Sequence, residues 1–162
     1  MSKEYHYDLV IVGGGPAGSS AAYAAAKNGV KVALIEKEDS IAETVRTSGV
    51  TWIESIKEFG IPENCYNPIK NFSFSSPNNE VTIKDSVATA AVLDVRKTYR
   101  WLVNEAEKMG ADVFVKTNIN DVIKNNDGDI IGVKGIGING KITFHSKIII
   151  DATGFTSTIS KA

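Results

Sequence analysis

In the first part of the chain, two short apolar runs flank a segment rich in small residues. Residues 7–12 are rich in β-branched apolar side chains and end at a glycine cluster, which predicts a short buried strand. The alanine-rich residues 16–28 predict a helix, with Pro16 in its first turn and Gly29 just past its end. Residues 31–36 predict a second buried strand. Strand, helix and strand within about thirty residues indicate a βαβ unit with a parallel pair.

The middle of the chain has a different pattern. Residues 48–59 predict a short helix, and residues 62–68 predict a loop. Apolar and polar side chains then alternate over residues 69–83 around a Ser-Pro-Asn-Asn turn, and residues 89–93 predict a further strand. Short strands joined by a turn are typical of an antiparallel insertion rather than of further βα units.

The last part of the chain begins with a helix and continues as strands. Asp94 is the predicted cap of a helix that runs to Met109 and stops at Gly110, because apolar residues recur on one face. Asn-Asp-Gly and Asn-Gly then separate apolar segments, which predicts hairpins and therefore a β-meander. The last apolar run ends at Ala-Thr-Gly. The predicted strands cover residues 111–115, 119–124, 130–138, 141–144 and 146–151.

The turn between the first strand and the first helix reads Gly-Gly-Gly-Pro-Ala-Gly. Gly13 permits a tight turn, Gly15 lets the backbone approach a pyrophosphate, and Gly18 lets the helix pack close to the strand. The phosphates would lie at the helix N-terminus, where free N–H groups and the helix dipole favour anions. Pro16 and Ala17 belong to the same predicted site.

Residues beyond the turn make a dinucleotide site more specific than the glycines alone. Ala22 keeps the helix face small, and Gly29 closes the helix before the second strand. Glu36 ends that strand about twenty residues after the glycines, where a carboxylate can accept both ribose hydroxyls. A carboxylate there would repel a 2′-phosphate, so FAD or NAD is expected rather than NADP. The alternative is a glycine-rich turn without a ligand, and spacing alone does not separate FAD from NAD.

Composition narrows the remaining possibilities. The 162 residues are 43% hydrophobic and 23% charged, as in ordinary soluble proteins. The net charge of -1 does not point to nucleic acid or an anionic membrane. The apolar runs are too short for a transmembrane helix, and no secretory signal is visible. Cys65 is the single cysteine, which excludes an internal disulfide and favours a cytoplasmic location. His6 and His145 are isolated along the chain, so no metal site is expected.

Several motifs together resemble the FAD-dependent oxidoreductases of the para-hydroxybenzoate hydroxylase type. These are the glycine turn, Glu36-Lys37, and Asp151-Ala-Thr-Gly154 after a later strand. The Leu-Asp-Val-Arg turn that opens the later helix is similar to the geranylgeranyl reductase branch. The resemblance covers nearly the whole chain and implies an α/β, Rossmann-like FAD-binding three-layer fold with a β-meander and a small antiparallel insertion. The insertion at about residues 60–93 agrees with FAD, because an NAD dehydrogenase more often continues with repeated βα units.

The resemblance also implies roles for residues outside the glycine turn. Arg46 matches a position that faces the flavin or its pyrophosphate, and Arg96 matches the arginine that approaches FAD from the later helix. Both can donate bidentate hydrogen bonds to phosphate, and the alternative for each is a solvated surface arginine. Asp151 is either part of the site or only a turn or cap residue. The predicted FAD-binding residues are Gly13, Gly15, Pro16, Ala17, Gly18, Glu36, Lys37, Arg46, Arg96, Thr153 and Gly154, with no catalytic residue and no metal ligand assigned.

Two features depart from the family pattern. Geranylgeranyl reductases commonly carry a cysteine after the arginine of the second-strand loop, where this chain has Thr47. The family also continues past the Asp-Ala-Thr-Gly motif with a Gly-Asp motif and the rest of the substrate domain. Residues 1–162 are therefore expected to be the N-terminal part of an FAD/NAD(P)-binding domain, with residues 60–93 in a substrate-side region and the C-terminal remainder absent.

The resemblance implies an FAD-dependent oxidoreductase that reduces carbon–carbon double bonds of an isoprenoid or lipid substrate. The alternatives are a flavin-dependent monooxygenase of the aromatic hydroxylase type and a non-catalytic nucleotide-binding fragment. The expected partners are FAD and an apolar small molecule or lipid, without nucleic acid. A lipid substrate would be compatible with peripheral membrane contact.

Overall fold

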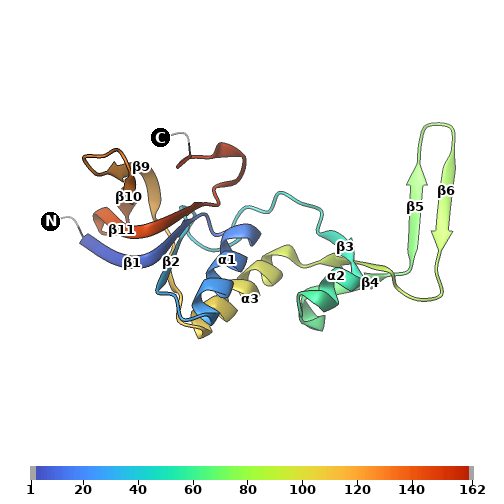
Figure 1. Cartoon of the computed structure of the whole chain (residues 1–162). Coiled ribbons are helices and arrows are strands. Elements are labelled where there is room, and N and C mark those ends of the chain that lie inside the picture. Colours follow the sequence, from blue (N-terminus) through green and yellow to red (C-terminus); the bar gives the residue numbers. More distant parts are fainter. Residues whose placement is uncertain (1–2, 161–162) are drawn as a thin grey trace. The chain divides into compact units, whose positions relative to one another are not determined.

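The computed structural model describes residues 3–160, and the chain divides into two compact units. The first unit comprises residues 1–43 and 99–162, and the second comprises residues 44–98. Figure 1 shows the elements in the order of the chain.

A six-stranded sheet in the order β8-β2-β1-β11-β10-β9 forms the centre of the first unit (Figure 1). The neighbours β8, β2, β1 and β11 are parallel, whereas β11, β10 and β9 form an antiparallel meander. The βαβ unit predicted from the sequence is present, with helix α1 (Pro16–Lys27) between the first two strands. The strands are β1 (Lys3–Val12), β2 (Val32–Ile35), β8 (Asp112–Phe114), β9 (Asn118–Lys124), β10 (Ile130–Gly137) and β11 (Gly140–Asp151).

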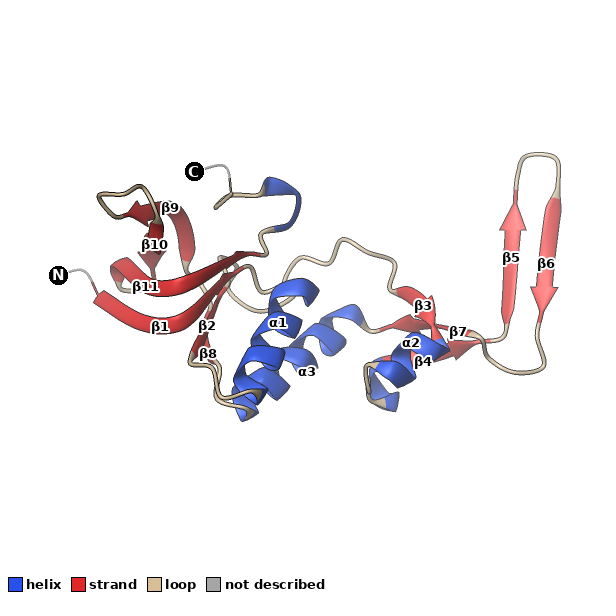
Figure 2. Ribbon diagram, in the orientation of Figure 1, coloured by secondary structure: helices blue, strands red, loops and turns tan. Residues whose placement is uncertain are grey.

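The parallel strands are buried on both faces, which gives two cores. One core joins Leu9, Ile11 and Leu34 to Ala22 of α1 and Val103 of helix α3 (Val95–Lys108). The other core joins the alternate strand residues to the meander, and its members include Val10, Val12, Ile35, Val122 and Val133. Figure 2 shows α1 beside the parallel strands of this unit. The arrangement of helices, sheet and meander confirms the predicted three-layer α/β fold.

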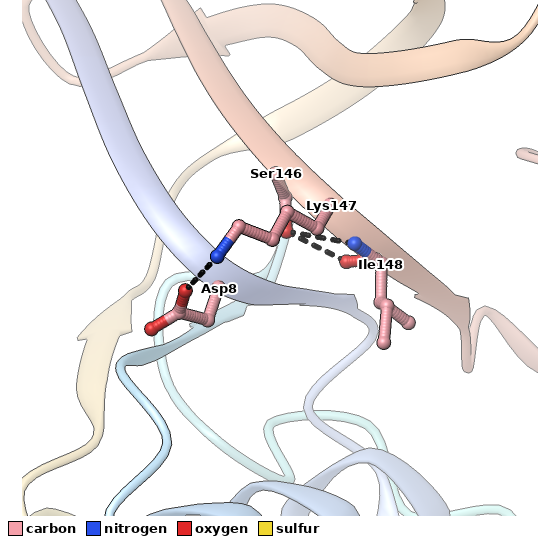
Figure 3. Close-up of polar contacts among 4 residues, drawn as sticks. All are labelled: Asp8, Ser146, Lys147 and Ile148. Atoms are coloured by element: carbon pink, nitrogen blue, oxygen red, sulfur yellow. Dashed lines mark hydrogen bonds and ion pairs between the residues drawn. The ribbon is translucent and has the colours of Figure 1, made fainter.

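Strand β11 runs through the position where the sequence pattern predicts two separate strands. Phe144 and Ile149 contact the same core, although strict alternation would place residues five apart on opposite faces. Between them, the Ser146 hydroxyl donates to the Ile148 carbonyl at 2.7 Å (Figure 3). This local irregularity lets one strand belong to the meander in its first half and to the parallel sheet in its second.

The neighbouring strand β1 is irregular at the same level. The N–H groups of Asp8 and Leu9 both donate to the carbonyl of Lys31, at 2.9 and 3.2 Å. An ion pair of 3.0 Å between the Lys147 ammonium and the Asp8 carboxylate joins the two irregular positions (Figure 3). The pair is exposed, so its contribution to stability is small.

The second unit contains two small antiparallel sheets, as the predicted insertion requires. One has the order β3-β7-β4, and the other is the β5–β6 hairpin. The elements are β3 (Val50–Trp52), α2 (Ile53–Glu58), the 3₁₀ helix η1 (Glu63–Cys65), β4 (Tyr66–Ile69), β5 (Asn71–Ser75), β6 (Glu80–Lys84) and β7 (Ala90–Leu93).

Two predictions for this unit are partly wrong. The helix expected over residues 48–59 occupies only Ile53–Glu58, because Val50 and Thr51 pair with β7 as a strand. The loop expected over residues 62–68 contains η1 and most of β4. In both places pairing with β7, which is distant in sequence, decides the local structure.

The packing around Phe144 generates a stability prediction. Phe144 is fully buried, and its ring lies 4.9 Å from that of Phe114 and 5.4 Å from that of Tyr5. Phe144→Ala should lower the free energy of unfolding by about 3–5 kcal/mol, because it removes buried apolar surface and leaves a cavity. Urea denaturation measures the loss. Ile138→Ala, at a residue 70% exposed, is the control and should change stability by less than about 0.5 kcal/mol. Equal losses in the two variants would contradict this packing.

Candidate cofactor-binding site

The glycine turn after β1 is shaped by close backbone contacts. Gly13 has φ +113°, and a Cβ there would collide with the carbonyl oxygen of Ala152. The Gly13 N–H donates to the Ile35 carbonyl at 2.7 Å. A Cβ on Gly18 would collide with the carbonyl oxygen of Gly13 and lie 3.2 Å from the Ala152 side chain. The ends of β1, β2 and β11 therefore meet at this turn only because these positions lack side chains.

Gly15 differs from its neighbours because its surroundings are open. Its backbone is extended, with φ -72° and ψ -176°, and a Cβ there would meet no atom within 4 Å. Gly15 is also the N-cap of α1, with no side-chain cap and no acidic residue in the first turn. The first amides of a helix lack intrahelical partners, and the helix dipole favours an anion there. An open space beside uncapped amides suits a pyrophosphate group.

Glu36 follows β2, and a hydrogen bond joins its carboxylate to the glycine turn. One carboxylate oxygen accepts the Gly14 N–H at 2.7 Å, and the other accepts the Glu38 N–H at 2.9 Å. The side chain is half-buried. Each carboxylate oxygen can accept a further hydrogen bond, so the group can still receive hydroxyl donors from a ribose.

Gly14 is a site residue that the sequence reasoning missed. A Cβ on Gly14 would lie 2.6 Å from the Ile41 side chain and 3.0 Å from the Glu36 carboxylate. The signal in the sequence is the middle glycine of the three, at a position where the motif accepts any residue.

The residues after β11 lie directly against the glycine turn. The Ala152 N–H donates to the Val12 carbonyl at 2.8 Å, which continues the pairing of β11 with β1 past the last strand residue. Thr153 and Gly154 follow, and Gly154 begins the 3₁₀ helix η2 (Gly154–Thr156). A small residue at this point leaves room for a cofactor beside the backbone.

Asp151 closes the turn that follows β11. One carboxylate oxygen accepts the N–H and the hydroxyl of Thr153, at 3.1 and 2.6 Å. The other accepts the N–H of Ile159 at 3.0 Å, and the N–H and hydroxyl of Ser160 at 2.8 and 2.9 Å. Partial burial alone would raise the pKa of this carboxyl, but the hydrogen bonds from Thr153 and Ser160 outweigh it and hold the pKa well below its usual range. Of the two roles predicted for Asp151, the turn role is the one these contacts describe.

The structure brings one group of the predicted residues together. The glycine turn, Glu36 and the Thr153–Gly154 segment meet at the carboxyl ends of β1, β2 and β11, the usual ligand edge of a parallel α/β sheet. Pro16 and Ala17 form the first turn of α1, and Lys37 is exposed beside Glu36.

Arg46 and Arg96 belong to the second unit, where both are exposed. Gly49, at φ +76°, brings their segments together, because a Cβ there would lie 2.8 Å from the Leu93 carbonyl oxygen and 2.8 Å from the Val95 side chain. Their roles at the cofactor stay predictions.

Cys65 is buried, and burial raises the pKa of its thiol. His6 and His145, far apart in sequence, are not isolated in space: their rings stack 4.9 Å apart across β1 and β11. Among residues 3–160, no group of three or more His, Cys, Asp or Glu side chains could hold a metal ion. No helix in this part of the chain is long and apolar enough to cross a membrane.

Comparison with known families decides which dinucleotide this site is built for. The family described as FAD dependent oxidoreductase matches residues 8–162. The chain belongs to this family. The prediction of FAD rather than NAD is therefore confirmed, as is assignment to an oxidoreductase family.

Individual relatives refine the comparison. A digeranylgeranylglycerophospholipid reductase of Methanocaldococcus jannaschii is 38% identical over 159 residues, which cover 96% of this chain and 40% of that protein. The crystal structure of a geranylgeranyl bacteriochlorophyll reductase-like protein from Thermoplasma acidophilum has a TM-score of 0.87 at 32% identity, over 98% of this chain and 42% of that one. The resemblance to the geranylgeranyl reductase branch is confirmed.

A third similarity concerns the fold alone. A myxobacterial chondrochloren halogenase, a variant of FAD-dependent halogenases, has a TM-score of 0.72 at 21% identity, over 97% of this chain and 39% of that one. The chain spans about 40% of the length of the curated reductases that it matches.

The contacts of Asp151 generate a prediction for stability and its pH dependence. Asp151→Asn should lower the free energy of unfolding at pH 7 by about 1.5–3 kcal/mol, because an amide nitrogen cannot accept the N–H groups of Ile159 and Ser160. The folded-state pKa lies below the unfolded value of about 3.9. The stabilisation is therefore fully present above that value and is lost as the pH falls toward the folded-state pKa.

Urea denaturation of wild type and Asp151→Asn from pH 7 to pH 3 measures this dependence. The difference between the two should be constant near neutrality and shrink below about pH 4. Asp8→Asn, which removes an exposed carboxylate on the neighbouring strand, is the control and should cost less. An Asp151→Asn protein as stable as wild type at pH 7 would contradict the role of these hydrogen bonds.

Proposed function

We propose that this chain binds FAD at the carboxyl ends of β1, β2 and β11, with the pyrophosphate at the N-terminus of α1. The observation that carries the proposal is the open space beside Gly15 at a helix start that has no side-chain cap. Everywhere else in the turn, missing side chains are explained by protein contacts at Gly13, Gly14 and Gly18. At Gly15 the chain itself supplies no reason for a glycine, whereas a bound pyrophosphate does.

The other predicted residues have defined roles in this proposal. The first turn of α1 presents backbone N–H groups to the phosphates from Ala17 onward, and Pro16, which has no N–H, begins the helix. Glu36 accepts the ribose hydroxyls of the adenosine, and Lys37 lies beside it on the exposed side. Thr153 and Gly154 line the approach to the glycine turn.

Two arginines complete the proposed set. Arg46 and Arg96 provide guanidinium groups for the pyrophosphate or the flavin. Both side chains are exposed, and the packing of Gly49 holds their two segments next to each other.

We further propose that the intact protein reduces carbon–carbon double bonds of an isoprenoid lipid. The support is the 38% identity to a digeranylgeranylglycerophospholipid reductase and the close structural match to a geranylgeranyl reductase-like protein. FAD, when bound and reduced, supplies the hydride. The residues of this chain bind and orient the cofactor, and the similarity to reductases favours this activity over aromatic hydroxylation.

The proposal includes an assignment of regions. Residues 1–162 form the N-terminal part of an FAD/NAD(P)-binding domain, and the insertion at about residues 60–93 belongs to the substrate side. A cytoplasmic location with peripheral contact to a lipid surface fits a lipid substrate and is part of the same proposal.

Gly15→Ala tests the cofactor site. Alanine is compatible with the extended backbone and the open space, so stability without cofactor should stay within about 0.5 kcal/mol of wild type. The dissociation constant for FAD should rise by at least about tenfold, because the new methyl group occupies the space of the pyrophosphate. Flavin fluorescence titration measures affinity, and urea denaturation measures stability.

Gly18→Ala is the matched control, since its Cβ would collide with the Gly13 carbonyl oxygen. It should lower stability as well as FAD affinity. A Gly15→Ala protein that binds FAD as tightly as wild type would place the pyrophosphate elsewhere.

The proposed activity predicts a stoichiometry. Under anaerobic conditions, a phospholipid with geranylgeranyl chains should reoxidise the reduced flavin of the intact protein. One flavin should be reoxidised for each double bond that is saturated. Flavin absorbance measures the reoxidation, and mass spectrometry of the lipid measures the number of double bonds saturated. Reoxidation that requires oxygen and inserts it into a substrate would instead support a monooxygenase, and protein that binds FAD without turnover would support a purely nucleotide-binding role.

A further inference from the structure

The turn after β11 carries two of the proposed FAD contacts and is held by a side chain outside the proposed set. We infer that Asp151 is a positioning residue for FAD: it holds the turn over residues 153–160 so that Thr153 and Gly154 lie beside the glycine turn. The inference rests on the proposed FAD site and adds to it a residue that need not touch the cofactor.

The first argument is the position of the strand end. Ala152 lies against the glycine turn so closely that a Cβ on Gly13 would collide with its carbonyl oxygen, and a Cβ on Gly18 would lie 3.2 Å from its side chain. Asp151 is the preceding residue and pairs with Val12 in the register of β1 and β11. A change in the direction of the chain at Asp151 is therefore transmitted directly to the backbone that faces the pyrophosphate space.

The second argument is that Asp151 accepts hydrogen bonds from both ends of the turn. Thr153 donates to one carboxylate oxygen, and Ile159 and Ser160 donate to the other. The Thr153 hydroxyl in turn accepts the Thr158 N–H at 2.9 Å. A single carboxylate thus closes the loop that contains Gly154.

The third argument is that little apolar packing holds the turn in its conformation. Ser157 has φ +45°, a left-handed conformation that is unfavourable for residues other than glycine, and Gly154 has φ +71°. The side chain of Phe155 is fully exposed, so it does not pack the turn in place. Only Ile159 is buried, at the far end of the turn, where its backbone N–H also donates to Asp151.

The charge of Asp151 is consistent with this role. A carboxylate at the cofactor edge would repel phosphates if it faced them. Here both oxygens accept donors from the turn itself, so the negative charge is compensated locally. The same hydrogen bonds hold the pKa of this carboxyl well below its usual range, so the group is ionised near neutral pH.

The experiment compares FAD binding by wild type, Asp151→Asn, Ser160→Ala and Val133→Ala in the intact protein. Asp151→Asn should weaken FAD binding by about tenfold or more and change the visible circular dichroism of the flavin at saturating FAD. Ser160→Ala removes a single hydroxyl donor and keeps the backbone bonds, so it should weaken binding by about twofold to threefold. Val133→Ala, in the meander-side core that also contains Ile159, lowers stability but removes none of the hydrogen bonds of Asp151, so it should leave the affinity and the spectrum of wild type.

The outcomes separate this inference from the proposed function. A wild-type protein that binds no FAD overturns both. If wild type binds FAD, and Asp151→Asn binds it with the same affinity and the same flavin spectrum, the positioning role alone is overturned. An equal loss of affinity in Val133→Ala also overturns it, because the effect would then follow general stability. If Asp151→Asn does not fold, Ser160→Ala decides: an affinity equal to wild type contradicts the inference, and the smaller loss with an altered flavin spectrum supports it.

Discussion

The close approach between the end of β11 and the glycine turn after β1 is the contact on which the rest of the site depends. Because the Ala152 carbonyl occupies the place of a side chain at Gly13, the two strand ends can lie side by side at the start of α1. Gly18 allows the helix to approach the same point. The helix start, Glu36 and the Thr153–Gly154 segment are brought to one edge of the sheet as a consequence.

The same fold occurs in proteins named for different reactions. The halogenase shares the fold at 21% identity, whereas the reductase-like structure shares both the fold and 32% of its residues. Fold alone does not select a reaction, because the chemistry depends on groups placed around the cofactor. In the proposed site, the residues of the first unit bind the dinucleotide.

Local patterns in the sequence were sufficient for the βαβ unit, the meander and the cap of α3. Gly29 and Gly110 end their helices with positive φ, and the Asp94 carboxylate accepts the Lys97 N–H, as the sequence predicted. Non-local contacts were the reason for the failures. The sequence pattern predicts two strands in place of β11, because the irregular middle of β11 is stabilised through β1. It predicts helix in place of β3, because the partner strand β7 lies far along the chain. Non-local contacts also matter in the site. Glycine is needed at position 14 because the Ile41 side chain lies close to it. The role of Asp151 depends on its hydrogen bond from Ser160.

The central claim is that FAD lies at the carboxyl ends of β1, β2 and β11, and backbone NMR of the intact protein titrated with FAD tests it most directly. The claim predicts that the amide signals of residues 13–15, Ala17, Gly18, Glu36 and residues 152–154 shift with saturation, and that those of the β9–β10 hairpin do not. Shifts confined to other parts of the chain, with the amides of Ala17 and Gly18 unchanged, would contradict it.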